Sequence, residues 1–270
     1  KFLSLYDALE LQWPTFVTLP PIMGPDGKKK LSKRDGAKDL LDYRNDGYLS
    51  EAMANFLALI GWNPGTDQEI FTIEELIANF SIKKIQRSGG AFNEEKLRWV
   101  NKKHLEQLSN REREQYFEKN LTIPDHVQQQ PQFSKERLKR LYVVIFERIQ
   151  VAKDASYFQL WEGEYNWAFG AIDYNTELLK WKNDTTIEDV LPRLKELRNL
   201  LNDADFSNVE NVKDCIWRYA EKVGKGEVLW PLRVALTGRE RSPDPFTCAY
   251  VLGKEETLSR IEAACAKIKQ

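Results

Sequence analysis

Residues 27–36 read Gly-Lys-Lys-Lys-Leu-Ser-Lys-Arg-Asp-Gly and form the most informative stretch of this 270-residue chain. Residues 28–38 carry six Lys or Arg against one Asp, so the segment is strongly cationic. Ammonium groups beside a hydroxyl suit a polyphosphate, on which negative charge builds during phosphoryl or nucleotidyl transfer. The alternative is a solvated basic turn, because short motifs of this kind often occur by chance. The flanking segments favour the phosphate-binding interpretation.

An extended segment and two helices flank this loop. Residues 13–23 are short, β-branched and bounded by prolines, which is typical of extended chain. Residues 39–49 predict a short helix that Gly47 ends, and a second helix runs from Glu51 to Ile60.

Four blocks occur in order along the chain, at residues 30–34, 46–62, 92–101 and 230–238. The first reads Lys-Leu-Ser-Lys-Arg, and the last reads Trp-Pro-Leu-Arg-Val-Ala-Leu-Thr-Gly. In this order they resemble the C-terminal portion of bacterial-type glutamyl-tRNA synthetases, which are class I enzymes. The first block is similar to the family's KMSKS signature, with Arg34 in the final position.

The resemblance implies a mainly α chain of four regions. They are the end of a class I catalytic domain with the signature loop (1–40), a small α+β stem-contact region (41–110), and two subdomains of an all-helical anticodon-binding module (111–170 and 171–270). The sequence itself shows no alternating strand pattern after residue 110. Relatives that read the anticodon with β-barrels would require such a pattern.

Local signals mark the expected helix ends. Capping boxes begin at Thr72 and Ser109, and Asn93 and Ser134 are expected N-caps. The helix after Ser134 carries apolar residues at three- and four-residue steps, and Val143 and Val144 widen this stripe enough to predict packing on two sides.

Two prolines are expected to open helices near the C-terminus. Pro231 begins a short helix that Gly238 ends, and Pro245 begins another that ends near Gly253. The last helix is expected to place four residues inward: Leu258, Ile261, Cys265 and Ile268.

Composition predicts a folded chain in a reducing, cytoplasmic setting. No apolar run approaches the ~20 residues of a membrane span. Cys215, Cys248 and Cys265 are odd in number and lack a pair spacing, so we expect buried thiols and no metal site. We expect a monomer with no DNA or membrane partner. Basic clusters at 83–103 and 135–148 fit an RNA backbone footprint, with solvated helix faces as the alternative.

The family's other signature, His-x-Gly-His, is absent from this sequence, whose only histidines are His104 and His126. The resemblance therefore implies that the half with that signature and the glutamate pocket precedes this chain, which we expect to be a fragment. Mg-bound ATP and glutamate are expected to bind the full-length enzyme through that missing catalytic half. We expect no cofactor in the fragment and no glutamate activation by it alone.

By resemblance, catalytic roles fall to three residues of the signature loop: Lys33, Lys30 and Ser32. Lys33 is expected at the ATP phosphates during adenylation, and Ser32 is expected to form hydrogen bonds within the loop. The same resemblance assigns four residues to the anticodon of tRNA(Glu): Arg148, Arg233, Ser242 and Pro243. Arg148 would read the third base, because its planar fork can donate two hydrogen bonds to a base edge.

Several alternatives stay open at this stage. Arg148 could be a surface arginine paired with Glu147 or Asp154. The enzyme could be non-discriminating, charging both tRNA(Glu) and tRNA(Gln), and a helical protein-interaction module is the less favoured function. Helical spacing explains Trp217, Tyr219 and Trp230 as core better than as stacking platforms. Six other aromatic residues suggest a packed seam between the two subdomains: Trp161, Tyr165, Trp167, Phe169, Tyr174 and Trp181.

Overall fold

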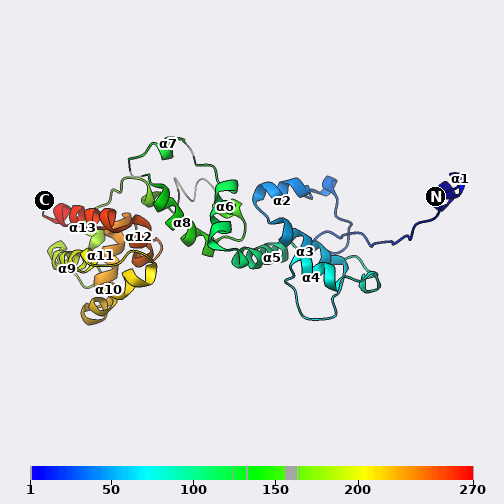
Figure 1. The fold of residues 1–270 in the computed structure, drawn as a ribbon. Helices are drawn as coiled ribbons and strands as arrows, with labels where there is room; N and C mark the ends of the chain where they lie inside the picture. The colour runs from blue at the N-terminus through cyan, green and yellow to red at the C-terminus, as the bar shows by residue number, and fades with distance from the viewer. Residues whose placement is uncertain (1, 124, 132, 156–162, 164, 270) are drawn as a thin grey trace. The chain divides into compact units, whose positions relative to one another are not determined.

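The computed structural model describes residues 2–123, 125–131, 133–155, 163 and 165–269 (Figure 1). Helices make up almost all of its regular structure, which confirms the prediction of a mainly α chain. The chain divides into two compact units, Lys1–Leu108 and Ser109–Gln270, and each unit is described by itself. Trp161, one of the aromatic residues expected in the seam, lies outside the described residues.

The helices of the first unit begin at side-chain caps. Thr72 Oγ1 accepts from the backbone N–H of Glu75 (3.2 Å), and the Glu75 carboxylate accepts from Thr72 N (2.9 Å), which is the predicted capping box. Asn93 Oδ1 accepts from Lys96 N (3.0 Å), also as predicted. The described helices are α1 (Phe2–Ala8), α2 (Leu40–Asp46), α3 (Ser50–Gly61), α4 (Ile73–Asn79) and α5 (Glu94–Gln107), with 3-10 turns η1 (Lys33–Asp35) and η2 (Ile82–Lys84).

Helices α3 and α5 pack together over the core of the first unit. The rings of Phe56 and Phe92 lie edge to face with centroids 5.1 Å apart. Asn55 is fully buried, and its Oδ1 accepts from Phe71 N (2.9 Å) and lies 3.0 Å from His104 Nε2. These polar groups are tolerated in the core because each one has a hydrogen-bond partner.

Strand pairing among the described residues is limited to isolated bridges. Met23 pairs with Lys30 and with Ala91, and Trp62 pairs with Ile85. A β component is expected for residues 41–110. Among the described residues it is limited to the two isolated bridges of Met23 with Ala91 and of Trp62 with Ile85.

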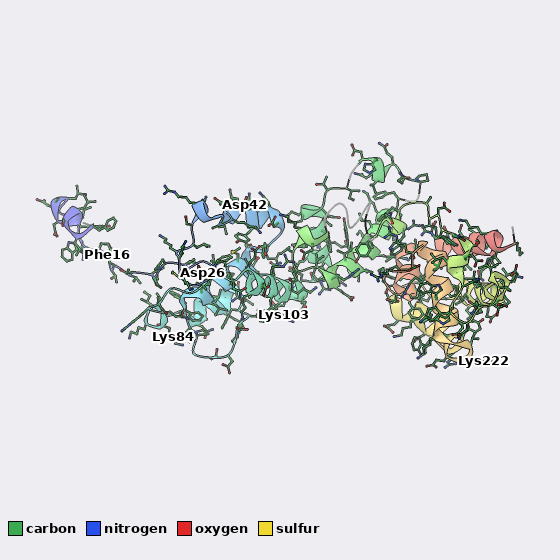
Figure 2. The ribbon with its side chains drawn as sticks, turned by 180° about the vertical axis from the view of Figure 1, so that it is seen from behind. Phe16, Asp26, Asp42, Lys84, Lys103 and Lys222 are labelled. Carbon is green, nitrogen blue, oxygen red and sulfur yellow. The ribbon has the colours of Figure 1, made fainter. Side chains whose placement is uncertain are left out.

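The N-terminal segment of the first unit, residues 2–19, exposes large apolar side chains. Phe2 is 72% exposed and Leu19 is 65% exposed. The ring of Phe16, labelled in Figure 2, lies 5.9 Å from that of Tyr6 on α1. Several large apolar side chains of this segment are therefore exposed to solvent, interspersed with polar residues.

Helices and 3-10 turns are the regular structure of the second unit among its described residues. The capping box at Ser109 is present, because Ser109 Oγ accepts from Glu112 N (3.4 Å) and the Glu112 carboxylate accepts from Ser109 N (2.8 Å). The described helices are α6 (Asn110–Asn120), α7 (Asp125–Gln128), α8 (Lys135–Arg148), α9 (Leu191–Asn202), α10 (Val209–Val223), α11 (Lys225–Thr237), α12 (Pro245–Leu252) and α13 (Lys254–Ile268), with 3-10 turns η3 (Ala152–Ala155), η5 (Asn166–Ala168), η6 (Thr176–Leu179) and η7 (Ile187–Val190).

Helix α8 confirms the predicted N-cap at Ser134 but packs on a narrower stripe than expected. Ser134 Oγ accepts from Arg137 N (3.4 Å). Val144 is 8% exposed, whereas Val143 is 54% exposed, so the prediction that Val143 widens the buried stripe is wrong. Successive helical residues point about 100° apart, and only Val144 falls on the face toward the core.

The prediction that Pro231 opens a helix is also wrong. Helix α11 begins at Lys225, after Gly224 (φ 135°), and contains Pro231 in its interior. Proline removes one backbone donor and disfavours an interior position, but burial of the flanking residues outweighs this cost. Val228 and Leu232 are fully buried on either side of it. Gly238 ends the helix as predicted, with φ 66°.

Helices α9 to α13 form the core of the second unit, with α13 packed on both α9 and α11. The inner face of α13 is rotated slightly from the predicted one. Ile261 and Ile268 are buried as expected, but Thr257, Arg260 and Ala264 replace Leu258 and Cys265 on that face.

Candidate functional site

The signature loop is a tight hairpin seated on the core of the first unit. Leu31 N donates to Ile22 O (2.8 Å), and Gly24 N donates to Lys29 O (2.7 Å), so the basic residues occupy its turn and second arm. Met23 N donates to Gly90 O (3.0 Å) on the neighbouring segment. A Cβ at the adjacent Gly89 would lie 2.3 Å from Pro21 O, so only glycine permits this approach of the hairpin.

The loop residues Lys30, Ser32 and Lys33 lie on the surface, in and just after this hairpin. Ser32 Oγ accepts from Arg34 N (3.2 Å) and caps η1. The Nζ of Lys33 forms an ion pair with the Asp39 carboxylate. Lys30 is exposed. The turn therefore presents two ammonium groups beside a hydroxyl, the arrangement that suits a polyphosphate.

Asp39 connects the signature loop to helix α2. Its Oδ1 accepts from Leu41 N (3.1 Å) and caps α2, while its other oxygen pairs with Lys33. The hydrogen bond and charge of Asp39 raise the pKa of Lys33, and Lys33 in turn lowers the pKa of Asp39. Lys33 is thus held as an ammonium, and a phosphate at this position would compete with Asp39 for it.

Two of the four expected anticodon residues, Ser242 and Pro243, lie together in the loop between α11 and α12, and Arg233 lies on α11. Ser242 Oγ donates to Pro243 O (2.7 Å), and the buried Cys248 thiol lies 3.7 Å from Ser242 Oγ and 3.5 Å from Pro243 O. Burial raises the pKa of Cys248 to about 12, while the charge of Arg233 on α11 lowers it. Cys248 is therefore a neutral group that packs against Ser242 and Pro243.

Arg148, the fourth expected residue, is the last residue of α8 and is exposed. Its Nη1 donates to the hydroxyl of Tyr165, and its guanidinium carbon lies 5.6 Å from the centre of the Tyr165 ring. Asp154, considered as an alternative partner, accepts from Gln150 N (2.8 Å) and Val151 N (3.1 Å). Sequence reasoning did not connect Arg148 with Tyr165, because the two lie on different segments.

Trp217 on α10 is half-buried and packs near the start of α12, although helical spacing favoured a core position. Its ring centre is 6.1 Å from that of Phe246, which closely follows Pro243. Lys225 Nζ lies 4.4 Å from the centre of the Trp217 ring, and Lys213 Nζ lies 5.8 Å from it. A part-exposed indole between two ammonium groups suits a nucleic-acid base with its phosphates.

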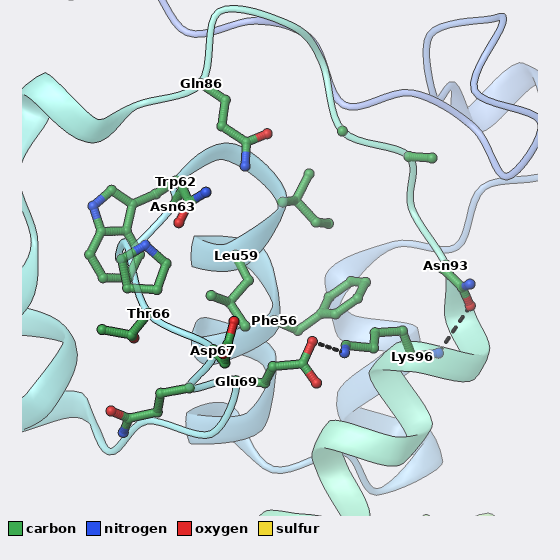
Figure 3. Close-up of a pocket in the computed structure, with 15 residues that line it drawn as sticks. Phe56, Leu59, Trp62, Asn63, Thr66, Asp67, Glu69, Gln86, Asn93 and Lys96 are labelled. Carbon is green, nitrogen blue, oxygen red and sulfur yellow. Dashed lines mark hydrogen bonds and ion pairs between the residues drawn. The ribbon is translucent and has the colours of Figure 1, made fainter.

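A cavity of about 620 Å³ opens in the first unit between the end of α3 and the start of α5 (Figure 3). The Lys96 ammonium pairs with Glu69 on one wall, and Asn93 caps α5 beside it. Asp67 adds a second carboxylate to this lining, so the cavity carries a net negative charge and lacks the basic character of the signature loop.

No group of His, Cys, Asp and Glu able to hold a metal ion occurs within the part of the chain that the structure describes. Within the same part, none of the helices combines the length and the apolar character needed to cross a bilayer.

Two family models match the chain along its length. Residues 114–265 match the anticodon binding domain, and residues 1–99 match the catalytic domain of tRNA synthetases class I (E and Q). The chain therefore belongs to the class I aminoacyl-tRNA synthetases that carry this anticodon binding domain, which confirms the family resemblance of the sequence.

The chain is similar to several glutamate–tRNA ligases. The chain is 35% identical to the ligase of Clostridium novyi, covering all of this chain and 54% of that protein. It is 33% identical to the ligase of Clostridium kluyveri, covering 53% of it. A crystal structure of a glutamate tRNA ligase from Elizabethkingia meningosepticum matches 98% of this chain with a TM-score of 0.67 and 28% identity. The chain spans about half the length of these relatives.

Proposed function

We propose that this chain is the tRNA-reading part of a glutamate–tRNA ligase, which joins glutamate to tRNA(Glu) with ATP through a glutamyl-adenylate. The observation that carries the proposal is the match of residues 114–265 to the anticodon binding domain, which contains Arg233 on α11 and Ser242 and Pro243 in the loop that follows it. A guanidinium, a hydroxyl and a rigid proline suit the splayed bases of a single-stranded anticodon. In this proposal Arg148 reads the third base.

The signature loop has a separate role in the proposal. Lys33 and Lys30 would neutralise the phosphates of Mg-bound ATP, and Ser32 would hold the turn that presents them. The exposed apolar side chains of residues 2–19 fit a contact with the remainder of a class I catalytic domain.

The expected working state is a monomer in the cytoplasm. The three cysteines, Cys215, Cys248 and Cys265, are free thiols, which suits a reducing compartment. Because the sequence contains no His-x-Gly-His turn, the 270-residue chain assayed alone is expected to give no glutamate-dependent ATP–pyrophosphate exchange.

The proposal is tested by titrating the chain with a tRNA(Glu) transcript at several salt concentrations. Phosphate contacts make log affinity fall linearly with log salt, with a slope of about −0.7 per phosphate on single strands. A Kd that does not respond to salt, or no binding at any salt, would contradict the proposal and favour a protein-interaction module.

Substitutions can separate the effect of one base contact on tRNA affinity from the effect of losing any positive charge. Arg233→Gln is expected to weaken binding by about 10-fold or more, the usual loss for one base contact. Arg198→Gln is the matched control, because Arg198 forms a surface ion pair with Glu262 on the distant α9–α13 face. Trp217→Ala is expected to weaken binding to a similar degree, since stacking contributes about 1–3 kcal/mol per base.

A further inference from the structure

Arginines from several elements of the second unit hold one short segment, residues 165–170. Arg260 on α13 donates from Nη1 to Trp167 O (2.8 Å) and from Nη2 to Gly170 O (3.4 Å). Arg137 on α8 donates from Nη1 to Ala168 O (3.0 Å). The backbone of the segment is therefore fixed to α8 on one side and to α13 on the other.

The side chains of the same segment hold two further arginines. Tyr165 accepts from Arg148 Nη1 through its hydroxyl, and Asn166 Oδ1 accepts from Arg239 Nη2 (2.6 Å). Arg239 lies at the start of the loop that carries Ser242 and Pro243. Two adjacent residues thus make these contacts. Tyr165 contacts Arg148, proposed for the third anticodon base, and Asn166 contacts the loop proposed for the other bases.

Aromatic packing makes the segment rigid. Tyr165 is 4% exposed, Trp167 is 1% exposed and Phe169 is 3% exposed. The Phe169 ring lies 5.8 Å from that of Phe133, just before α8. Three of the six aromatic residues expected in a packed seam are therefore buried here, and their arginine partners are what the sequence alone did not show.

We propose that Tyr165 is a specificity-determining positioning residue, whose hydroxyl orients the Arg148 guanidinium for the third anticodon base. Asn166 fixes the register of the Ser242 loop through Arg239 in the same way. The inference rests on the proposed function, since it assigns a role within the same anticodon site.

The orientation of the Arg148 guanidinium matters because an arginine side chain is both flexible and planar at its end. The side chain has many rotamers, and its planar fork pairs well with a base edge only in a narrow range of orientations. A guanidinium carries several N–H donors, so an anchoring bond at Nη1 is compatible with a bidentate pairing elsewhere on the fork. The Tyr165 hydroxyl, placed by the buried segment, can therefore select the orientation that favours one base.

The role of the hydroxyl can be separated from that of the ring. Tyr165→Phe keeps the buried ring, and the bonds from Arg260 and Arg137 to the backbone of the segment do not involve the hydroxyl. Tyr142→Phe is the matched control, because Tyr142 is 4% exposed, lies on α8 and stacks on Phe117 at 4.4 Å.

The test is a double-mutant cycle on the full chain, with a tRNA(Glu) transcript and the same transcript with its third anticodon base changed from C to G. Tyr165→Phe is expected to reduce the ratio of the two affinities by roughly 5-fold, the effect of about 1 kcal/mol. In an Arg148→Gln background the same change is expected to leave the ratio unaltered. The thermal unfolding midpoint should match that of Tyr142→Phe.

The other outcomes are decisive in different ways. An unchanged ratio in Tyr165→Phe, with tight binding by the unsubstituted chain, would overturn the role of Tyr165 and leave the proposed function intact. An equal loss for both transcripts, or a loss that persists in the Arg148→Gln background, would show that the hydroxyl does not act through Arg148. Equal affinity of the unsubstituted chain for both transcripts would refute third-base reading, and no binding by it would overturn the proposed function itself.

Discussion

Arg260→Met is expected to destabilise the second unit strongly, because Arg260 is a buried charge with hydrogen bonds to several segments. Arg260 is 6% exposed, and its Nε donates to Glu256 Oε1 (2.7 Å) while its Nη1 donates to Trp167 O and to Leu236 O. Breaking a buried ion pair costs about 3–5 kcal/mol. The Glu256 side chain is 25% exposed, so the lower end of that range, about 3 kcal/mol, applies.

Scanning calorimetry of the full chain measures this effect as a shift of one transition. For a unit of this size, 1 kcal/mol lowers Tm by about 2–4 °C, so Arg260→Met is expected to lower it by roughly 6–12 °C. Arg198→Met is the control, because the Arg198 and Glu262 side chains are 42% and 56% exposed. A surface pair of that kind contributes about 0–1 kcal/mol. Equal Tm shifts for the two variants would refute the reasoning.

Two further predictions concern stability. Burial lowers the pKa of His104, so the folded first unit holds it neutral while the unfolded chain takes up a proton below pH 6.5. Stability measured by urea unfolding should therefore be constant above that pH and fall below it by at most about 1.4 kcal/mol per pH unit, and His104→Gln should remove this slope. Gly226→Ala is expected to destabilise the second unit by about 1–3 kcal/mol, because the new Cβ would lie 2.3 Å from the Trp181 ring. Gly61→Ala, which meets no atom within 4 Å, is expected to stabilise α3 by about 0.5–1 kcal/mol, and a loss there would contradict the packing argument.

Helix ends were predictable from the sequence wherever a local side chain fixes them. Thr72, Ser109 and Ser134 each accept a hydrogen bond from a backbone N–H three residues later, and this chemistry depends only on neighbouring residues. Gly238 ends α11 with a positive φ for the same local reason.

Interior features of the helices depended on tertiary packing and were harder to predict. Pro231 is a helix opener by local preference, yet Val228 and Leu232 are buried around it, and Trp230 Nε1 donates to Leu178 O (2.8 Å). These contacts stabilise the helical turn before the proline. They are tertiary contacts, so the residues next to Pro231 in the sequence do not predict them.

The candidate site likewise has one part that neighbouring residues in the sequence predict and one part that only tertiary packing creates. Ser242 and Pro243 are adjacent in sequence, in the loop that directly follows the helix of Arg233. The contact between Arg148 and Tyr165 joins residues that are 17 positions apart on separate segments. No periodicity connects a helix end with a following loop, so only the folded chain shows this pair.

The central claim is that this chain reads the anticodon of tRNA(Glu). The most direct measurement compares its Kd for a tRNA(Glu) transcript with its Kd for the same transcript carrying an unrelated anticodon, at one fixed salt concentration. Because each mismatched base costs about 1–3 kcal/mol, replacing the anticodon is expected to weaken binding by roughly 100-fold or more. Equal affinity for the two transcripts would contradict the account, since phosphate contacts alone would then explain all of the binding.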